Sequence, residues 1–353
     1  MSPRVTMADV GRLAGVSHQT VSRVLNEPHR VNAETRDRVQ DAIKSLRYHR
    51  STVARALATN RTRSVGLIST GLALHSHSKR MIAFNEAARA SGYQVSMASL
   101  PTAEREPMQA ALDVLMGQGV EGIVLIVADK RALDIIDALD LDVPLVVADS
   151  GGSSDRHNVA IDQFLGARMA TAHLIELGHS RIAHLSGPDW SLDASERLRG
   201  WRTELESAGL PVIEPLEGNW TPESGYERGL ELAASGDVTA VFAANDQMAL
   251  GLLHGLSDGG VGVPGGMSVV GFDDIPEAAH FIPPLTTVRQ DFVQLGFQIM
   301  STLLGLIDDT DVPEFVHTEP QLIVRKSTAA PSASVSGRPA SAVSASGAER
   351  GNG

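Results

Sequence analysis

Three short segments near the start of the chain carry apolar residues at helical spacing. Each begins at a side chain that can cap a helix: Thr6, with the acid Asp9 three residues on, then Ser17, then Asn32. A tight break at residues 15–16 separates the first two segments. The apolar residues that we expect to face inward are Val10, Leu13, Ala14, Val21, Val24, Leu25, Val39, Ala42, Ile43 and Leu46. This pattern predicts an all-α helix-turn-helix headpiece over residues 1–50.

The second segment, residues 17–26, combines its apolar face with many polar side chains. His18, Gln19 and Arg23 project from its N-terminal half and can read base edges in a major groove. Hydroxyl and amide groups suit phosphate oxygens, which fix the register without reading sequence. The candidates for these backbone contacts are Thr6, Ser17, Thr20, Ser22 and Asn26. The segment therefore predicts a domain that binds double-stranded DNA.

From residue 64 the pattern changes to short apolar runs that alternate with helical segments. The runs are VGLIS (65–69), YQVSMASL (93–100), GIVLIV (122–127), LVVAD (145–149), IAHLSG (182–187), AVFAAND (240–246), SVVGFDD (268–274) and TTVRQDF (286–292), with an amphipathic helix around 164–177. Such alternation predicts parallel sheets with helices on both faces. Two sets of runs of similar size indicate an α/β core of two linked parallel-sheet subdomains over residues 64–328.

Polar residues end several of these runs, namely Asp149, Asn245-Asp246, Asp273-Asp274 and Gln290-Asp291. Ligands of such sheets bind at the carboxyl ends of the strands. A mixture of carboxylates and amides suits a hydroxyl-rich ligand, because each hydroxyl both donates and accepts. Any one Asp or Asn at a strand end has a simpler explanation as a turn former. Four such ends in one cleft favour a ligand site.

Charge divides the chain at the same place. Residues 1–63 hold 12 Lys and Arg against five Asp and Glu, a formal charge of +7, whereas the whole chain carries −12 and the remainder therefore −19. A basic head on an acidic body indicates that the head alone meets a polyanion. Charge alone would also fit a solvated basic face. The chain has no cysteine, which excludes disulfides and thiolate metal sites and fits a reducing compartment.

Several classes of protein are disfavoured by what the sequence lacks. No apolar run approaches the roughly 18 residues of a membrane span. The N-terminus has no long apolar stretch before a cleavage-like site, so we expect a cytoplasmic protein, nucleoid-associated when DNA-bound, and no membrane partner. His75 and His77 form an HxH pair without a third ligand at convincing spacing, so neither a metal nor a cofactor is expected. The Ala-, Ser-, Gly- and Pro-rich residues 329–353 predict a disordered tail.

The run TMADVGRLAGVSHQTVSRVLN, followed by VNAETRDRVQDAIKSLRY, resembles the headpiece of the LacI/GalR family of transcriptional repressors. The resemblance continues through LALHSHS, HLIELGH, RLRGW, EGNWTPESG, ANDQMALG, VVGFDD and IPPLTTVRQDF, from about residue 4 to about residue 330. It implies a homodimer on a pseudo-palindromic operator and a core like that of periplasmic binding proteins. Residues 51–63 would form the hinge helix, with Leu57 as the minor-groove wedge. His49 and Arg50 depart from the proline and asparagine that the family usually has after Tyr48.

The resemblance also implies contacts to a sugar between the two subdomains. Trp220 would stack on the apolar face of the sugar, and polar side chains would hold its hydroxyls. The implied polar contacts are Asp149, Arg197, Asn245 and Asp273, and the rest of the wall is Leu74, Gln290 and Phe292. These contacts imply a small sugar inducer of the galactoside type, which separates the hinge segments and releases the DNA.

Three positions depart from the pattern of the sugar-responsive family members. Asp193, which we also expect to contact the ligand, stands where a serine lies near the inducer, and His77 replaces a proline in the segment after Leu74. Both changes bear on which glycoside fits. Asn85 stands where a lysine is buried at the subunit interface, so the allosteric energetics are expected to differ.

Two other classes of protein fit parts of the pattern. A sugar-binding transport protein of the periplasmic kind shares the core architecture, but the headpiece and the missing signal peptide argue against it. A glycosidase would use paired carboxylates, for which Asp149 and Asp273-Asp274 are candidates, yet hydroxyl recognition explains these residues equally well. We therefore expect a repressor and not an enzyme. Because residues 331–353 contain no Leu or Ile, we expect a dimer without a tail-mediated tetramer.

Overall fold

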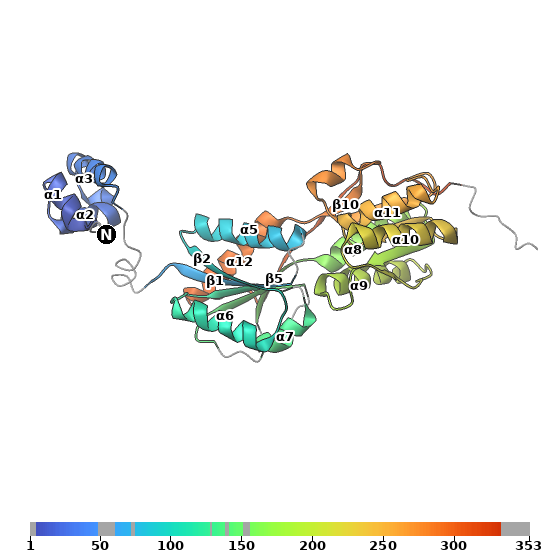
Figure 1. The fold of residues 1–353 in the computed structure, drawn as a ribbon, viewed down its shortest axis with the longest axis horizontal. Coiled ribbons are helices and arrows are strands. Elements are labelled where there is room, and N and C mark those ends of the chain that lie inside the picture. Colours follow the sequence, from blue (N-terminus) through green and yellow to red (C-terminus); the bar gives the residue numbers. More distant parts are fainter. Residues whose placement is uncertain are drawn as a thin grey trace, which may run out of the picture. The chain divides into compact units, whose positions relative to one another are not determined.

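The computed structural model describes residues 5–48, 61–71, 75–127, 129–137, 141–150 and 156–332. The chain divides into two compact units, residues 1–63 and residues 64–353 (Figure 1). The predicted wedge Leu57, the predicted wall residue Leu74 and residues 333–353 of the expected tail lie outside the described residues.

The described helices of the smaller unit are α1 (Met7–Ala14), α2 (His18–Asn26) and α3 (Ala33–Leu46), with the short 3-10 helix η1 (Pro28–Arg30) before α3. The three predicted caps are confirmed. Thr6 and Asp9 form a capping box, and Ser17 and Asn32 each accept a hydrogen bond from a backbone N–H of the first turn. Gly15 ends α1 at a φ of 68°, a left-handed conformation that costs glycine little.

Side chains from all three helices fill the core of this unit. The buried apolar residues are Val10, Ala14, Val21, Val24, Val39, Ala42 and Tyr48. The expectation for Leu13 was wrong, because 56% of its surface is exposed. Helix α1 packs through residues four apart, Val10 and Ala14, and position 13 therefore falls on its outer flank.

The larger unit contains two sheets, each with helices on both faces. The first sheet has the order β11-β5-β4-β3-β1-β2 and defines the first subdomain. Its strands are β1 (Ser64–Thr70), β2 (Gln94–Leu100), β3 (Ile123–Ile126), β4 (Leu145–Ala148), β5 (His157–Ile161) and β11 (Phe315–Thr318). All of its neighbouring strands are parallel.

The second sheet has the order β12-β10-β9-β8-β6-β7 and defines the second subdomain. Its strands are β6 (Ile182–Ser186), β7 (Leu216–Glu217), β8 (Ala240–Ala243), β9 (Ser268–Asp273), β10 (Thr286–Arg289) and β12 (Gln321–Ile323). All of its neighbours are parallel except β12, which is antiparallel to β10. The predicted fold class, a helical headpiece followed by two linked parallel-sheet subdomains, is confirmed.

Helices cover both faces of each sheet (Figure 1). In the first subdomain these are α5 (His75–Ala90), α6 (Arg105–Gly117), α7 (Lys130–Asp137) and α12 (Phe292–Ile307). In the second they are α8 (Gln163–Glu176), α9 (Leu192–Ser207), α10 (Pro222–Ser235) and α11 (Asp246–Asp258), with the 3-10 helix η2 (Pro276–His280). No described helix is both long enough and apolar enough to cross a membrane.

Within the described residues, three connections pass between the subdomains: from β5 to α8, from β10 to α12, and from β11 to β12. As a result α12 lies beside α5 in the first subdomain, although it follows β10 in sequence (Figure 1). The run TTVRQDF was expected to be one strand through residue 292, but β10 ends at Arg289 and Phe292 already begins α12. The run spans one of these connections, which explains the difference.

The packed part of the larger unit extends past the expected boundary at residue 328. The backbone N–H of Ala329 donates to Ser268 Oγ at 3.0 Å, and its carbonyl oxygen lies 2.9 Å from His179 Nε2. The C-terminal segment up to this residue is therefore held against the second sheet.

Acid is expected to destabilise the larger unit through His184. This residue is fully buried on β6 between the rings of Trp201 and Phe242, with centroids 5.4 and 4.7 Å away. Burial lowers the pKa of His184 to about 3. The unfolded chain takes up the proton first, so stability is present above the ordinary pKa of about 6.5 and is lost as the pH falls toward 3, by about 1.4 kcal/mol per pH unit.

Urea unfolding at pH 7, 6 and 5 measures this effect. His184→Phe keeps the stacked rings and is expected to reduce the pH dependence, while the buried His77, whose pKa is lowered to about 4, still contributes to it. The control His280→Gln changes an exposed histidine of the same subdomain. Equal slopes for His184→Phe and the wild type would contradict the assignment.

Candidate DNA-reading surface and ligand cleft

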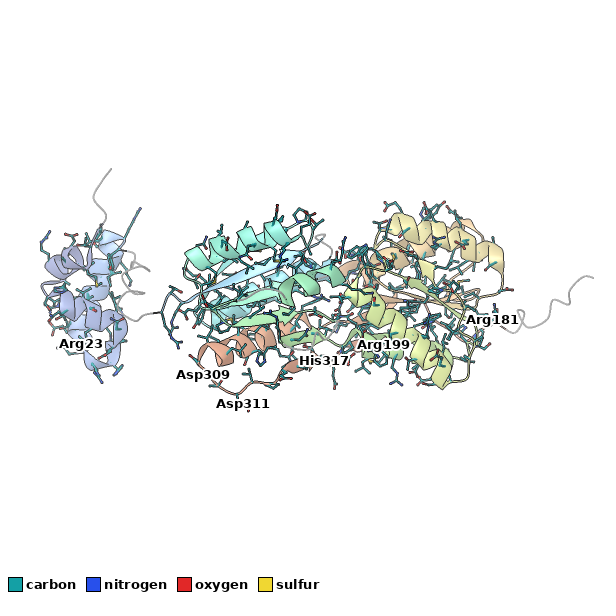
Figure 2. The ribbon with its side chains drawn as sticks, turned by 90° about the horizontal axis from the view of Figure 1, so that it is seen from below. Arg23, Arg181, Arg199, Asp309, Asp311 and His317 are labelled. Carbon is teal, nitrogen blue, oxygen red and sulfur yellow. The ribbon has the colours of Figure 1, made fainter. Side chains whose placement is uncertain are left out.

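The face of α2 that the sequence predicts to read bases is exposed. His18, Gln19 and Arg23 all lie at the surface, and Figure 2 labels Arg23 on the helical unit. Val21 and Val24 are buried and hold the helix against its neighbours. The helix therefore exposes side chains with hydrogen-bond donors and acceptors on one side and packs against the core of the unit with the other.

The predicted phosphate contacts differ in how far their groups are already engaged. Ser17 Oγ accepts from the backbone of Thr20, and Asn26 Nδ2 donates to Ser22 Oγ at 3.1 Å. Thr6 donates its hydroxyl proton to the Asp9 carboxylate at 2.7 Å. Of the five candidates, Thr6 is thus the least suited to a phosphate, because its donor already has an anionic partner.

A narrow cavity of about 30 Å³ lies between the two subdomains. Its described lining is His75, Ser76, His77 and Arg80 from α5, and Trp190, Ser191, Asp193, Arg197, Trp220, Asn245, Gln247 and Asp273 from the second subdomain. The structure therefore brings together five of the predicted ligand contacts, namely Asp193, Arg197, Trp220, Asn245 and Asp273. Several of them stand at or just after the carboxyl ends of strands, as expected for this fold.

Trp220 is held in a backbone conformation that is rare for a side chain of its size. Its φ is 74°, in the left-handed region. Asn245 Nδ2 donates to the Trp220 carbonyl at 3.1 Å, while Asn245 Oδ1 caps α11. A Cβ at Gly187 would lie 2.2 Å from the indole ring, so the bare backbone of Gly187 makes room for it. The indole is thereby fixed at the cavity wall.

A chain of hydrogen bonds joins Arg197 to Asp273. Arg197 Nε donates to Gln163 Oε1 at 2.9 Å, Gln163 Nε2 donates to Gln290 Oε1 at 2.9 Å, and Gln290 Nε2 donates to Asp273 Oδ1 at 2.5 Å. The Asp273 carboxylate lies 3.6 Å from Arg197 Nη2, which closes the ring. Burial raises the pKa of Asp273 above its ordinary value, although the Arg197 guanidinium acts in the opposite direction.

An ion pair crosses the cleft between the subdomains. Arg80 Nη2, on α5, lies 2.7 Å from Asp193 Oδ2, on α9. Asp193 Oδ1 also accepts from Ser150 Oγ at 2.5 Å. Burial alone would raise the pKa of Asp193, but the Arg80 and Arg197 guanidinium groups bring it below its ordinary value. The carboxylate is therefore ionised at neutral pH.

Sequence reasoning missed Arg80 and Gln163. The departure at Asp193 carried a signal for Arg80, because an added carboxylate in a buried cleft requires an added cation. Gln163 gave no comparable signal, since a glutamine in the first turn of a helix is ordinary at the surface. Here it is 1% exposed and relays the hydrogen bonds between Arg197 and Gln290.

Two predicted contacts line a different hollow. Gln290 and Phe292 border a neighbouring depression of about 380 Å³ together with His75 and Lys79, and Asp273 borders both spaces. Gln290 is linked to the cleft through its hydrogen bond to Asp273 and, by way of Gln163, to Arg197. Phe292 is half-buried against the core of the first subdomain.

Asp149 is not part of the described cavity lining. It follows β4 and is buried, with Oδ2 accepting from Asn158 Nδ2 at 2.7 Å. Its neighbour Ser150 is the residue that touches the cleft, through Asp193. An approach of Asp149 to a bound sugar would therefore need a change in this wall.

The two histidines of the HxH pair have different surroundings. His77 is buried, with Nε2 2.6 Å from Ser69 Oγ, and burial together with Arg80 lowers its pKa to about 4. His75 is half-buried and borders both hollows. Across the described ranges, no group of three or more His, Asp or Glu side chains is placed to hold a metal ion. Asn85 is exposed on α5.

Two parts of the chain match known protein families. Residues 6–51 match the bacterial regulatory proteins of the lacI family, and residues 171–328 match the periplasmic binding protein-like domain. The lactose operon repressor of Escherichia coli K12 is 35% identical over 329 residues, which cover 93% of this chain and 91% of that protein. The HTH-type transcriptional repressor PurR of Actinobacillus pleuropneumoniae serotype 3 is 35% identical over 331 residues, covering 91% of this chain and 98% of that protein.

Solved structures agree with these matches. The Lac repressor dimer bound to operator and the anti-inducer ONPF superposes with a TM-score of 0.82 at 34% identity, covering 93% of this chain and all of that chain. The complex of the transcriptional regulator CelR with cellobiose gives a TM-score of 0.68 at 32% identity, covering 92% and all of the two chains. The expected resemblance of the headpiece and the core to the LacI/GalR family is thus confirmed. The chain belongs to the lacI family of bacterial regulatory proteins and is a transcriptional repressor of that family.

Proposed function

We propose that this repressor binds a pseudo-palindromic operator as a homodimer and releases it when a galactoside enters the cleft. The observation that carries the proposal is the cleft itself, where the fixed indole of Trp220 stands beside the hydrogen-bonded ring of Arg197 and Asp273. A pyranose has a flat patch of C–H bonds and a rim of hydroxyls. The cleft offers a surface for each.

The polar groups of the cleft discriminate by the orientation of hydroxyls. Asp273 accepts, Arg197 donates, and the amide of Asn245 does both. An epimer with a misplaced hydroxyl leaves a buried donor or acceptor unpaired, at about 1–3 kcal/mol. The similarity to the lactose operon repressor supports a galactoside in particular, while the CelR complex with cellobiose keeps another glycoside open as an outcome of the test.

Release of DNA requires the sugar to bind one state of the repressor better than the other. The lining of the cleft comes from both subdomains, so closure or opening of the cleft changes its affinity for the sugar. A hundredfold loss of operator affinity requires a coupling free energy of about 2.7 kcal/mol. Residues 51–63, with Leu57 as the proposed minor-groove wedge, would transmit this change to the DNA.

Binding-site selection with the full chain, followed by a release assay, tests the proposal. We expect selection to return a pseudo-palindrome and binding to weaken as salt rises, because phosphate contacts release counterions. Galactosides should then release the selected DNA. Release by glucosides or ribosides, with no response to any galactoside, would overturn the sugar assignment but not the DNA-binding role.

Exposed apolar side chains support the proposed homodimer. In the second subdomain, Leu250 lies with Tyr226 and His254 around an open hollow between α10 and α11. In the first, Met97 and Val114 are each 61% exposed beside the hollow between β2 and α6. Covering these surfaces with a second copy would remove apolar area from water.

Leu250→Asp and Val114→Asp are expected to weaken the dimer roughly tenfold or more each, since a charge would be buried without a partner. Sedimentation across a range of concentrations measures the change from a species of twice the 37.4 kDa chain mass. Val212→Asp, at another partly exposed valine, serves as the control. Unchanged dimers in both variants would place the interface elsewhere.

A further inference from the structure

The described part of the wall that the first subdomain contributes to the cleft is polar. Its described lining residues are His75, Ser76, His77 and Arg80, and none of them is aliphatic. The second subdomain supplies the indole of Trp220 and the groups proposed to hold the sugar ring. Whatever is attached to that ring on the other side therefore meets the α5 wall.

Arg80 has an unused donor at this wall. Its side chain is 5% exposed, and Nη2 is bound to Asp193. Its Nε–H is buried and has no hydrogen-bond partner among the described residues. A buried guanidinium nitrogen without an acceptor is unusual, and here it belongs to a residue that lines the cavity.

Gln247 contributes the complementary group, an acceptor without a donor. Gln247 lines the same cavity, and its Oε1 is buried and accepts no hydrogen bond within the described part of the chain. The residues that line the cavity therefore include one donor that lacks an acceptor and one acceptor that lacks a donor. A hydroxyl group can serve either of them, because it both donates and accepts.

Asp193 keeps Arg80 in place. Its carboxylate accepts from Arg80 and from Ser150, and Arg197 Nη2 lies 3.9 Å away. An apolar group pressed against this pair would remove water from two charges and leave the Arg80 Nε–H unpaired. A hydroxylated group would supply the hydrogen bonds of the water that it displaces.

We propose that Arg80 and Asp193 select the substituent on the sugar, favouring a hydroxyl-rich one, such as a second sugar ring or a polyol, over an alkyl or aryl group. This inference rests on the proposed function, because it takes the sugar ring to lie at Trp220. It adds the chemical class of the remainder of the ligand, which the contacts to the ring do not specify.

Two matched series of glycosides test the proposal on the full-length repressor. One series holds methyl, isopropyl, phenyl and glyceryl galactosides with lactose, and the other holds the same glucosides with cellobiose. Dissociation constants come from calorimetry. In any series that binds, we expect the glyceryl and disaccharide ligands to bind at least tenfold more tightly than the phenyl and isopropyl ligands.

Variants separate the pair from the rest of the cleft. Arg80→Met with Asp193→Ser removes both charges together, and the tenfold preference is expected to vanish or reverse. Arg80→Lys keeps a cation beside Asp193 but lacks the Nε–H donor. It therefore tests the role of that unpaired donor without leaving the carboxylate unpaired. The matched control is Arg168→Met with Glu204→Ser, which removes a 2.7 Å ion pair between α8 and α9 outside the cleft and is expected to keep the preference.

The outcomes distinguish the two proposals. Equal affinities for phenyl and glyceryl ligands in the wild type, or the same preference in the wild type and both Arg80 variants, would overturn the role of the pair while galactoside-driven release could still stand. Glucosides that bind with the expected preference while galactosides do not would overturn the sugar assignment alone. Absence of binding in both series would overturn both.

Discussion

Trp220→Ala is expected to abolish sugar-driven release of DNA while leaving operator affinity intact. The indole is the flat apolar surface of the proposed ring site, and its loss should weaken sugar binding at least a hundredfold, about 2.7 kcal/mol. The DNA-reading helix α2 belongs to the other compact unit, so its surface is unchanged by the substitution. Fluorescence anisotropy of a labelled operator, titrated with galactosides, measures both quantities in one experiment.

Two further variants sharpen this prediction. Trp220→Phe keeps a flat apolar ring and should retain part of the response. Gly187→Ala should reproduce much of the defect without removing the indole, because the new Cβ would meet the ring at 2.2 Å. If Trp220→Ala releases the operator at the same sugar concentration as the wild type, the indole does not support the sugar ring.

Arg23→Ala and Gln19→Ala are expected to relax sequence recognition by the repressor. A long side chain that forms two hydrogen bonds with a base edge contributes about 1–3 kcal/mol of discrimination. In a dimer the loss occurs once in each half-site, so roughly 2–6 kcal/mol of specificity is at stake for each substitution. Binding-site selection should then show one position per half-site at which all four bases are tolerated.

Arg12→Ala is the matched control for Arg23→Ala. It also removes one exposed positive charge from the helical unit, but from α1, where Arg12 pairs with Asp9 at 3.2 Å. We expect it to change affinity by a similar small factor for all DNA sequences. If Arg23→Ala behaves in the same way, Arg23 contacts phosphate and does not read a base.

Much of the fold follows from local sequence. The caps at Thr6, Ser17 and Asn32 and most of the buried central strands are properties of short segments, and these were predicted. Strands β5, β7, β11 and β12 were not predicted. The last three lie at sheet edges with partly exposed side chains and show no apolar run, whereas β5 lies inside the first sheet but is a short segment that begins with His157 and Asn158. Leu13 shows that spacing identifies a helix but not which of its apolar residues face the core.

The candidate site also contains residues that local sequence predicts and residues that it does not. Asp273 and Asn245 follow buried strands, and their meeting in one cleft could be predicted from the strand ends. The Arg80–Asp193 contact joins residues 113 positions apart on two helices, and no local pattern encodes such a distance. The placement of Phe292 depended on where a connection crosses between subdomains, which apolar periodicity does not reveal.

The three connections between the subdomains also constrain how such repressors can be recombined. A chimaera that joins the first half of one repressor to the second half of another at a single junction near residue 162 would receive α12 and β11 from the wrong parent. The core of its first subdomain would then pair Phe84 and Ala87 of one parent with foreign counterparts of Leu295 and Ile299. Exchanging a whole subdomain, and with it one wall of the cleft, requires crossovers at all three connections.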